Sequence, residues 1–412
     1  MLRETGERAR QAAIALAQTT DAQRANALLA MASQLMAETD LVLAANREDL
    51  DQAMDEGLPP AMLDRLALNP ARVADMARGL EEAAALPDPL GEIQWKTVRP
   101  NGLKIRRVSV PLGVVAVIFE ARPNVTADAA GLCLRAGNAC ILRGGKEAIR
   151  SNLAVAAALR QALKELGLPE DAVQLVEGTS RESADALMRL DGFVDVLIPR
   201  GGPGLIRRAV EYATVPVIET GEGVCHIYVD KDADVLMAAD IIHNAKTSRC
   251  SVCNACECML IHQDIAAKAL PVVGKKLMDE GVTIKGDSRS REILPGIATA
   301  TEEDWGREYL DLTIASKVVK DMEEALGHIA RYGTGHSEAI ITENKAAASG
   351  FLSRVDAAAV YHNASTRFTD GGEFGFGAEI GISTQKLHAR GPVGVKSLTS
   401  YKYIIEGTGQ TR

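Results

Sequence analysis

The chain has 412 residues, 47% of them hydrophobic, and its 46 basic and 55 acidic side chains give a net charge of −9. A chain of this length divides into two or three domains, and this hydrophobic fraction excludes a disordered protein. The acidic balance, with no basic block, argues against a general nucleic-acid binder.

Neither the apolar runs nor the cysteines point to export or to a membrane. The best apolar run is Val114–Phe119, whereas a membrane span needs roughly 18 residues. The first residues also lack the apolar core of a signal peptide. Seven cysteines are too few for a disulfide framework in so long a chain. We therefore expect a cytoplasmic protein with reduced thiols and no membrane partner.

Residues 1 to about 90 predict a helical layer without chemistry of its own. The stretch is rich in alanine and has helical periodicity. Thr20 and Gln23 can form a capping box, and Asn69 followed by Pro70 is typical of a helix start.

The pattern changes at residue 93. Residues 93–108 predict two strands around the turn Pro100-Asn101-Gly102. Polar residues occur on both faces, so we expect this hairpin to project and to leave edges for a partner. The tail from Leu398 predicts a further strand, which could pair with the hairpin.

Short apolar runs then alternate with amphipathic helices, which predicts right-handed βαβ units and parallel, doubly wound sheets. The first series has strands at 114–119, 139–143, 173–176, 194–199 and 215–218, with helices at 147–166 and 204–212. The second series has strands at 224–230, 259–262, 312–319, 339–342 and 359–362, with a helix at 233–246 and another that follows the strand at 259–262 and runs to 280. The fold class is therefore α/β, with two such domains in tandem. Ligands are expected at the carboxyl ends of the strands.

Two glycine-rich turns follow strands and open helices. The first ends its strand at Arg143 and continues with two glycines and Lys146. It fails the P-loop pattern, but two cations beside helix amides would suit a phosphate. The second carries Gly201 and Gly202, although the dinucleotide fingerprint would need glycine where Arg207 stands. Either turn can also be a plain connection.

For three further polar residues, the sequence allows either a chemical or a structural role. Glu219 lies beside glycines at an expected strand end, where it could be a general base, a hydrogen-bond organiser or a satisfied loop glutamate. His226, inside an apolar strand, fits a packed core histidine better than a ligand, and His388 lies in an expected loop.

Four cysteines cluster in one segment: Cys250, Cys253, Cys256 and Cys258. Their spacing invites an iron–sulfur or zinc site, but it departs from the ferredoxin pattern and no second segment supplies further ligands. A second interpretation makes one of them a thiolate nucleophile in a polar loop. A third treats a given thiol as a small buried hydrophobe.

The order of several motifs resembles the aldehyde dehydrogenase superfamily over essentially the whole chain. These motifs are Pro111–Asn124, Gly137-Asn138, Ile218–Glu222, Ser251–Ala255, Leu387–Gly394 and Thr399–Tyr403. Two of them, FEARPN and SVCNA, are typical of the branch that reduces glutamyl phosphate. The resemblance implies an enzyme that reduces L-glutamyl 5-phosphate with NADPH to L-glutamate 5-semialdehyde in L-proline biosynthesis, through a cysteine thioester and with release of phosphate.

The same resemblance assigns catalytic and cofactor residues. It makes Cys253 the nucleophile and Asn124 an oxyanion donor. Arg143 matches the lysine that holds the adenosine ribose. Lys146 falls near the glutamate of NAD-preferring members, and because a cation there can pair with a 2′-phosphate, the expected cofactor is NADP(H).

Further residues are carried over in the same way. Gly201 and Gly202 match the second nucleotide-binding turn, and Glu308 matches the glutamate that holds the nicotinamide ribose. Glu219 matches the general base of hydrolytic relatives. Candidates for the cations that the phosphate and the substrate carboxylate need are Arg122, Arg367 and Arg390. No metal is implied.

The implied architecture has two doubly wound α/β domains and a small β oligomerisation arm. Residues 1–92 and 109–221 would form the cofactor-binding domain, 222–395 the catalytic domain, and 93–108 with 396–412 the arm. The arm would complete a partner's sheet in a homodimer or homotetramer. An association with glutamate 5-kinase, which makes the unstable substrate, is also implied as a partner.

Two rival functions and one regulatory hypothesis accompany this interpretation. The rivals are an aldehyde dehydrogenase that acylates coenzyme A instead of phosphate, and a metal-cluster protein that uses the four clustered cysteines. The branch typically has proline where Cys250 stands, and Cys256 and Cys258 are additional. A disulfide between one of these thiols and Cys253 would make activity redox-sensitive.

Overall fold

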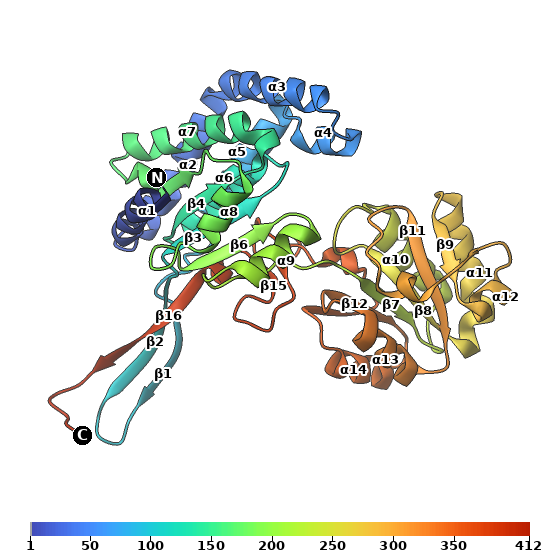
Figure 1. The fold of residues 1–412 in the computed structure, drawn as a ribbon. Coiled ribbons are helices and arrows are strands. Elements are labelled where there is room, and N and C mark those ends of the chain that lie inside the picture. The colour runs from blue at the N-terminus through green and yellow to red at the C-terminus, as the bar shows by residue number, and fades with distance from the viewer. Residues whose placement is uncertain (1) are drawn as a thin grey trace. The chain divides into compact units, whose positions relative to one another are not determined.

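The computed structural model describes residues 2–412, with the exception of the Ala61 side chain, and divides into two compact units (Figure 1). The first unit contains the chain through Thr220, together with Gly375–Gly381 and Leu387–Arg412. The second contains Gly221–Phe374 and Ile382–Lys386.

The first unit opens with the expected helical layer. Its helices are α1 (Leu2–Leu16), α2 (Asp21–Ala37), α3 (Thr39–Asp55), α4 (Pro60–Leu66) and α5 (Pro70–Ala85). Both predicted helix starts are confirmed. Thr20 and Gln23 form the capping box of α2. Asn69, which precedes Pro70, caps α5, and its side chain accepts a hydrogen bond from the Arg72 N–H.

A four-stranded parallel sheet in the order β5-β4-β3-β6 forms the core of this unit. Its strands and helices are β3 (Val114–Phe119), α6 (Asn124–Arg135), β4 (Ala139–Arg143), α7 (Ile149–Glu165), β5 (Val173–Leu175), α8 (Arg181–Met188), β6 (Val196–Arg200) and α9 (Pro203–Tyr212). Every residue of β3 is buried, as its central position requires.

The strand expected at 215–218 is wrong. This run makes only a single bridge, between Leu197 and Val217. Pro216 interrupts the run, and because proline has no backbone N–H, it cannot take part in a regular ladder.

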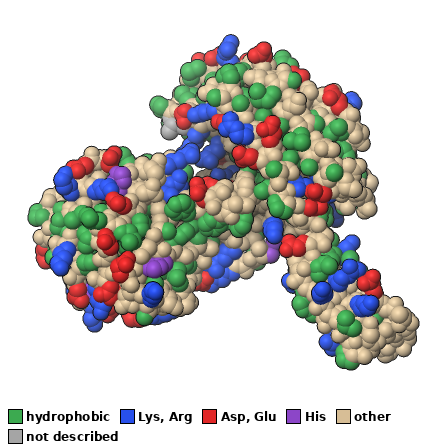
Figure 2. Space-filling model, turned by 180° about the vertical axis from the view of Figure 1, so that it is seen from behind, with side chains coloured by type: hydrophobic (Ala, Val, Ile, Leu, Met, Phe, Trp, Pro, Cys, Tyr) green, Lys and Arg blue, Asp and Glu red, His purple; other side chains and the backbone are tan. Residues whose placement is uncertain are grey.

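The expected hairpin and tail form one three-stranded antiparallel sheet, the arm, in the order β1-β2-β16. Its strands are β1 (Ile93–Val98), β2 (Lys104–Pro111) and β16 (Thr399–Glu406). Pairing places Trp95, Arg107 and Tyr403 in one row and Lys96, Arg106 and Ile404 in the next. Neighbouring rows face opposite sides of a sheet, so one face carries exposed aromatic side chains and the other is rich in basic ones. Figure 2 shows many Lys and Arg side chains on the arm.

The second unit is built on a seven-stranded sheet in the order β10-β9-β11-β8-β7-β12-β13, in which all described pairs are parallel. Its strands are β7 (Cys225–Val229), β8 (Cys256–His262), β9 (Thr283–Gly286), β10 (Ala298–Thr299), β11 (Thr313–Val319), β12 (Ser337–Ile341) and β13 (Ala359–His362). Its helices are α10 (Val235–Thr247), α11 (Gln263–Asp279), α12 (Ser288–Ile293), α13 (Met322–Tyr332) and α14 (Lys345–Arg354). The short strand β14 (Ile382–Ser383) belongs to this unit, whereas the short strand β15 (Gly391–Pro392) belongs to the first unit.

The division of the chain differs from the expected domains near the carboxyl end. Residues 375–381 and 387–395, expected in the catalytic domain, belong to the first unit. Hydrogen bonds from Ile380 N–H to the Val393 carbonyl, and from Val393 N–H to the Gly381 carbonyl, tie these segments together.

Among residues 2–412, no single helix is long and apolar enough to cross a membrane. The pair α2 and α3 meets that test only jointly, with a bend of 66° between them.

Candidate active site

Four strands in the middle of the second sheet bring a set of polar residues to one edge. The order β11-β8-β7-β12 makes these strands neighbours, and all run in the same direction. Just before them in the chain stand, in the same order, Glu308, Cys253, Gly223 and His336. The candidate site of the second unit therefore lies at the amino ends of its strands, whereas the sequence favoured the carboxyl ends.

Cys253 lies in the turn between α10 and β8 and is partly exposed. Its carbonyl accepts a hydrogen bond from the Cys225 thiol at 3.2 Å. Next to it runs Gly223, where an added Cβ would lie 1.5 Å from the Cys253 carbonyl oxygen. The Gly223 N–H in turn donates to Glu308 Oε1 at 2.9 Å. The turn that carries Cys253 and the expected ribose-binding glutamate are thus connected through the backbone of Gly223.

The Cys253 thiol contacts an imidazole that sequence reasoning missed. His336 Nε2 lies 3.2 Å from Cys253 Sγ. The His336 side chain is fully buried, and this desolvation lowers its pKa to about 4. The imidazole is therefore neutral near pH 7. A partly exposed thiol in contact with a neutral imidazole is an arrangement that can generate a thiolate. The signal in the sequence is a histidine directly before a buried strand.

A cation also adjoins the turn that carries Cys253. The Arg367 guanidinium donates to Asn254 Oδ1 and, at 3.2 Å, to Ser248 Oγ. The Asn254 side chain donates back to the carbonyls of Arg367 and Thr369, at 3.2 and 2.9 Å. Burial lowers the pKa of Arg367. Of the three arginines considered for the anionic groups of the substrate, this one shares a unit with Cys253, whereas Arg122 and Arg390 belong to the first unit.

In the first unit, the expected cofactor residues follow the carboxyl ends of neighbouring strands. Arg143 is the last residue of β4, and its guanidinium donates to the carbonyls of Thr179 and Ser180, at 2.6 and 2.9 Å. Its Nε is buried without a hydrogen-bond partner among the described residues. Lys146 begins the next turn of helix, is exposed, and pairs with Glu56 at 2.7 Å.

The turn after β6 holds the second pair of expected cofactor residues. Gly202 N–H donates to Glu120 Oε2 at 2.9 Å, and a Cβ on Gly201 would lie 2.5 Å from the same oxygen. Glu219 lies in a loop of this unit and is half-buried.

Asn124, the expected oxyanion donor, is the first residue of α6 in the first unit. Its side-chain amide donates to Asp128 Oδ2 at 2.8 Å. An amide group has two N–H donors, so one remains for a further acceptor. Burial raises the pKa of Asp128 to about 6.

The cysteine cluster separates into two environments. Cys250 and Cys253 lie in the turn and are partly exposed, whereas Cys256 and Cys258 belong to β8 and are fully buried. Within residues 2–412, the four thiols do not come close enough together to hold one metal ion. The strand geometry therefore speaks against the metal-cluster alternative.

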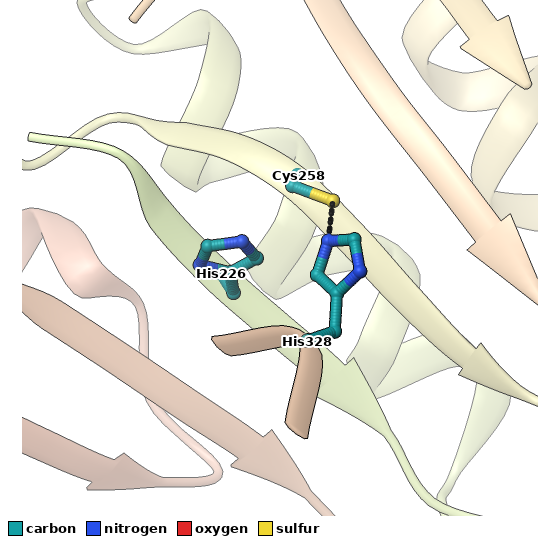
Figure 3. A group of neighbouring side chains, drawn as sticks. All are labelled: His226, Cys258 and His328. Atoms are coloured by element: carbon teal, nitrogen blue, oxygen red, sulfur yellow. Dashed lines mark hydrogen bonds between the residues drawn. The ribbon is translucent and has the colours of Figure 1, made fainter. Parts of the chain in front are cut away.

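A different group could hold a metal by distance alone: His226, Cys258 and His328, whose ligand atoms lie within 4.8 Å of one another (Figure 3). Lys317 Nζ lies 3.5 Å from His328 Nδ1, so Nδ1 accepts there and Nε2 carries the proton toward Cys258 Sγ, 3.8 Å away. A metal would have to displace that proton beside an ammonium group. His226 is fully buried and its Nδ1 bonds to Glu338 at 3.1 Å, in keeping with the expected core histidine.

The model of the aldehyde dehydrogenase family matches residues 2–294. The chain belongs to that family. This confirms the resemblance seen in the sequence motifs and, with it, the α/β fold.

Two sets of relatives place the chain more narrowly within the aldehyde dehydrogenase family. Proteins called γ-glutamyl phosphate reductase from Moorella thermoacetica and Clostridium beijerinckii are each 58% identical over 407 residues, which cover 99% of this chain and 97% and 98% of theirs. The crystal structure of γ-glutamyl phosphate reductase from Thermotoga maritima is 48% identical, covers 99% of both chains and gives a TM-score of 0.98. These relatives are enzymes, and so is this member of the family.

More distant members share the fold. The acetylating aldehyde dehydrogenase from Geobacillus thermoglucosidasius is 18% identical, with a TM-score of 0.70 over 100% of this chain and 97% of its own. An engineered glycolyl-CoA reductase, whose structure contains NADP⁺, is 17% identical, with a TM-score of 0.70 over 98% of this chain and 96% of its own.

Proposed function

We propose that this enzyme reduces L-glutamyl 5-phosphate to L-glutamate 5-semialdehyde and releases phosphate, as a step of proline biosynthesis. Support comes from the relatives that carry the name γ-glutamyl phosphate reductase. The observation that carries the chemistry is the contact between Cys253 Sγ and His336 Nε2 at 3.2 Å. Cys253 is partly exposed, whereas Cys258, the other thiol of the cluster that lies beside an imidazole, is fully buried, so Cys253 is the one that an imidazole can activate for a substrate.

The first step forms a thioester on Cys253. The thiolate attacks the acyl carbon, a sulfur–carbon bond forms, and the bond from that carbon to the phosphate oxygen breaks. A thiol suits this reaction because a thioester is electrophilic enough to accept hydride. The Cys253 backbone N–H and the Asn124 amide are the proposed oxyanion donors, and one such donor is worth about 3 kcal/mol in other enzymes.

Arg367 is the cation that we propose for the departing phosphate or the substrate carboxylate. Its guanidinium is anchored by Asn254, the residue after the nucleophile. A planar guanidinium held in this way is well suited to an anionic oxygen pair.

A nicotinamide cofactor supplies the hydride that reduces the thioester. The residues of the first unit fit such a cofactor: Arg143 retains a buried N–H without a partner among the described residues, and an added Cβ at Gly201 would lie 2.5 Å from Glu120 Oε2 and 2.9 Å from the Leu205 side chain. We propose that Arg143 and Lys146 select NADP(H), with Gly201 and Gly202 along the nucleotide, Glu219 as a hydrogen-bond organiser and Glu308 at the nicotinamide ribose.

The pairing of Lys146 with Glu56 makes the cofactor proposal testable. A 2′-phosphate has to compete with the Glu56 carboxylate for Lys146. Lys146→Glu is therefore expected to raise the KM for NADPH at least tenfold and to leave that for NADH nearly unchanged, because only NADPH carries the phosphate. If the KM values for NADPH and NADH change equally, Lys146 does not select NADPH over NADH.

The main experiment runs the reaction in reverse, because glutamyl phosphate cyclises readily. Glutamate semialdehyde, phosphate and NADP⁺ are mixed with the enzyme, and NADPH is followed. Wild type is compared with Cys253→Ala and with Cys250→Ala, a control thiol of the same loop that is also partly exposed. Phosphate-dependent NADPH that is lost only in Cys253→Ala supports the proposal. Activity that depends on coenzyme A instead of phosphate would favour the acylating alternative.

The assembly proposals rest on the arm and on the substrate. We propose that the arm pairs subunits into a homodimer or homotetramer. An association with glutamate 5-kinase would protect the unstable acyl phosphate in transit. Size-exclusion chromatography with light scattering, of the enzyme alone and mixed with the kinase, tests both.

A further inference from the structure

Behind the Cys253–His336 pair, an unbroken series of hydrogen bonds leads away from the nucleophile. His336 Nδ1 lies 2.8 Å from Ser337 Oγ. Ser337 Oγ lies 2.6 Å from Thr369 Oγ1, and Thr369 Oγ1 lies 2.7 Å from the Tyr361 hydroxyl. All five residues belong to the second unit.

The series starts in the core and ends at a partly exposed group. His336, Ser337 and Thr369 are fully buried. Tyr361, in β13, is half-buried. In every link after the thiol either atom can be the donor, since hydroxyl groups both donate and accept, and neutral imidazole does the same through its two nitrogens. The direction of the whole series can therefore reverse.

We propose that Ser337, Thr369 and Tyr361 form a proton relay that, through His336, removes the proton of the Cys253 thiol. This inference rests on the proposed function, in which Cys253 acts as a thiolate.

The proton balance follows from reversing each link. At the start the thiol donates to Nε2, Nδ1–H donates to Ser337, Ser337 to Thr369, and Thr369 to Tyr361. The thiol proton then passes to Nε2 while each proton farther along moves one group outward, and Tyr361 releases one proton to water. At the end Nε2–H donates to the thiolate, every hydroxyl has its proton again, and His336 is neutral.

Such a relay solves a problem that burial creates. A simple transfer from Cys253 to His336 would leave an imidazolium in a site where desolvation holds the pKa of His336 at about 4. Two further titratable neighbours, Cys225 and Arg367, do not supply a proton acceptor. The Cys225 thiol lies 3.8 Å from Nδ1, and burial raises its pKa well above the ordinary value, while Arg367 is a cation. The relay moves a full proton charge out of the core and leaves the imidazole uncharged.

Thr369 is the residue to test, because two substitutions distinguish the effect of losing its hydroxyl from the effect of changing its size. Thr369→Val keeps the size and removes the hydroxyl, whereas Thr369→Ser keeps the hydroxyl. The backbone carbonyl of Thr369, which accepts from Asn254, is retained in both. The readout is alkylation of Cys253 by iodoacetamide at neutral pH, followed by mass spectrometry of the Cys253 peptide, because the thiolate is the reactive form.

We expect Thr369→Val to slow this alkylation about tenfold or more, and Thr369→Ser to react nearly as wild type. In D₂O the turnover of Thr369→Val should show a larger solvent isotope effect than wild type, because proton removal limits the rate. Alkylation of Thr369→Val at the wild-type rate would overturn the relay, and so would a Thr369→Ser rate as slow as that of Thr369→Val.

A second variant guards against a folding defect at the buried position. Tyr361→Phe keeps the ring and removes the last hydroxyl, and we expect it to slow alkylation as well. If Thr369→Val does not fold and Tyr361→Phe reacts as wild type, the relay is wrong. Alkylation uses neither substrate nor cofactor, so it tests the relay independently of turnover. If the variants are alkylated as expected but the wild type shows no phosphate-dependent turnover, the proposed function is refuted and the relay is not.

Discussion

The carbonyl oxygen of Cys253 occupies the space in which residue 223 would carry its Cβ, 1.5 Å from the ideal position of that atom. Only glycine allows the two backbones to run so close together. The same glycine donates its N–H to Glu308. Gly223 therefore sets the position of the Cys253 turn relative to β7 and to Glu308.

From this contact we expect Gly223→Ala to abolish turnover, with a loss of at least a hundredfold, because a shift of about 1 Å at a reacting group has effects of this size. Alkylation of Cys253 should change as well, since the thiol moves relative to His336. The measurements are turnover in the reverse assay and the rate of iodoacetamide labelling.

A matched substitution in the same unit is Gly327→Ala, in α13, where an added Cβ meets no atom within 4 Å. It should keep full activity and gain up to about 1 kcal/mol of stability, because alanine is the better helix former. Activity retained in Gly223→Ala would show that the loop can move without cost.

A buried ion pair joins Lys246 of α10 to Glu257 of β8, the strand that follows the Cys253 turn. Its Nζ–Oε2 distance is 2.6 Å, and both side chains are fully buried. Burial raises the pKa of Glu257 to about 7 even with the lysine in place. Lys246→Met leaves this carboxyl without its cation and should lower the free energy of unfolding by about 3–5 kcal/mol.

The double variant Lys246→Met/Glu257→Leu removes both buried groups and should recover most of that loss. Urea denaturation of the wild type, the single and the double variant measures both changes. If Lys246→Met is as stable as wild type, the protonated Glu257 carboxyl can remain buried without the lysine.

The buried carboxyl of Asp128 makes the stability of the first unit depend on pH. Burial raises the pKa of its carboxyl from 3.8 to about 6 in the folded chain. Between these values the folded state binds the proton more tightly than the unfolded state, so this contribution to stability is complete below pH 4 and is lost as the pH rises through 6. Asp128→Asn should therefore be about 1–3 kcal/mol more stable than wild type at pH 7 and nearly equal to it at pH 4.

Asn at this position still offers an oxygen to the Asn124 amide, so that contact is kept. Thermal unfolding of both proteins between pH 4 and 8 tests the sign. As a control, Asp51→Asn changes an exposed carboxyl of α3 and should follow the wild type at each pH. A wild type that gains stability relative to Asp128→Asn from pH 4 to 7 would contradict the expected direction.

Local patterns predicted most of the strands because burial in a parallel sheet demands continuous apolar runs. The strands β3, β4 and β13 have the expected bounds, at 114–119, 139–143 and 359–362. The run at 215–218 has the same apolar character but contains Pro216, and a pattern of hydrophobicity alone does not register the missing N–H.

The candidate site was harder to predict because it is assembled across strands. Cys253 and Glu308 came from motif resemblance, whereas His336 belongs to no motif that the sequence analysis used. Its contact with Cys253 depends on the sheet order, in which β7 separates β8 from β12. Sequence spacing does not reveal such an order, and the general rule of ligands at carboxyl ends pointed to the opposite edge of this sheet.

The structure narrows the redox hypothesis to one thiol. Cys256 and Cys258 are fully buried in β8, whereas Cys250 is partly exposed in the same turn as Cys253. A disulfide needs accessible thiols and room for the backbone to adjust, which a turn offers and a central strand does not. We expect mild oxidation to inactivate wild type and Cys256→Ala reversibly but to spare Cys250→Ala from disulfide formation. Wild-type activity unchanged by the oxidant would refute the hypothesis.

The arm exposes apolar side chains on one face, and we expect this face to hold subunits together. On one of its faces Trp95, Tyr403 and Ile405 are 47%, 54% and 59% exposed. Exposed aromatic and aliphatic side chains on a projecting sheet are typical of an interface, so a charge there should be costly only in the assembled state. Tyr403→Glu is expected to shift the enzyme to monomers in light scattering while each subunit keeps its far-UV dichroism. Lys402→Glu changes charge on the opposite face of the same strand and should leave the assembly intact, because that face is rich in basic side chains. If Tyr403→Glu keeps the wild-type mass at micromolar concentration, the apolar face of the arm does not hold subunits together.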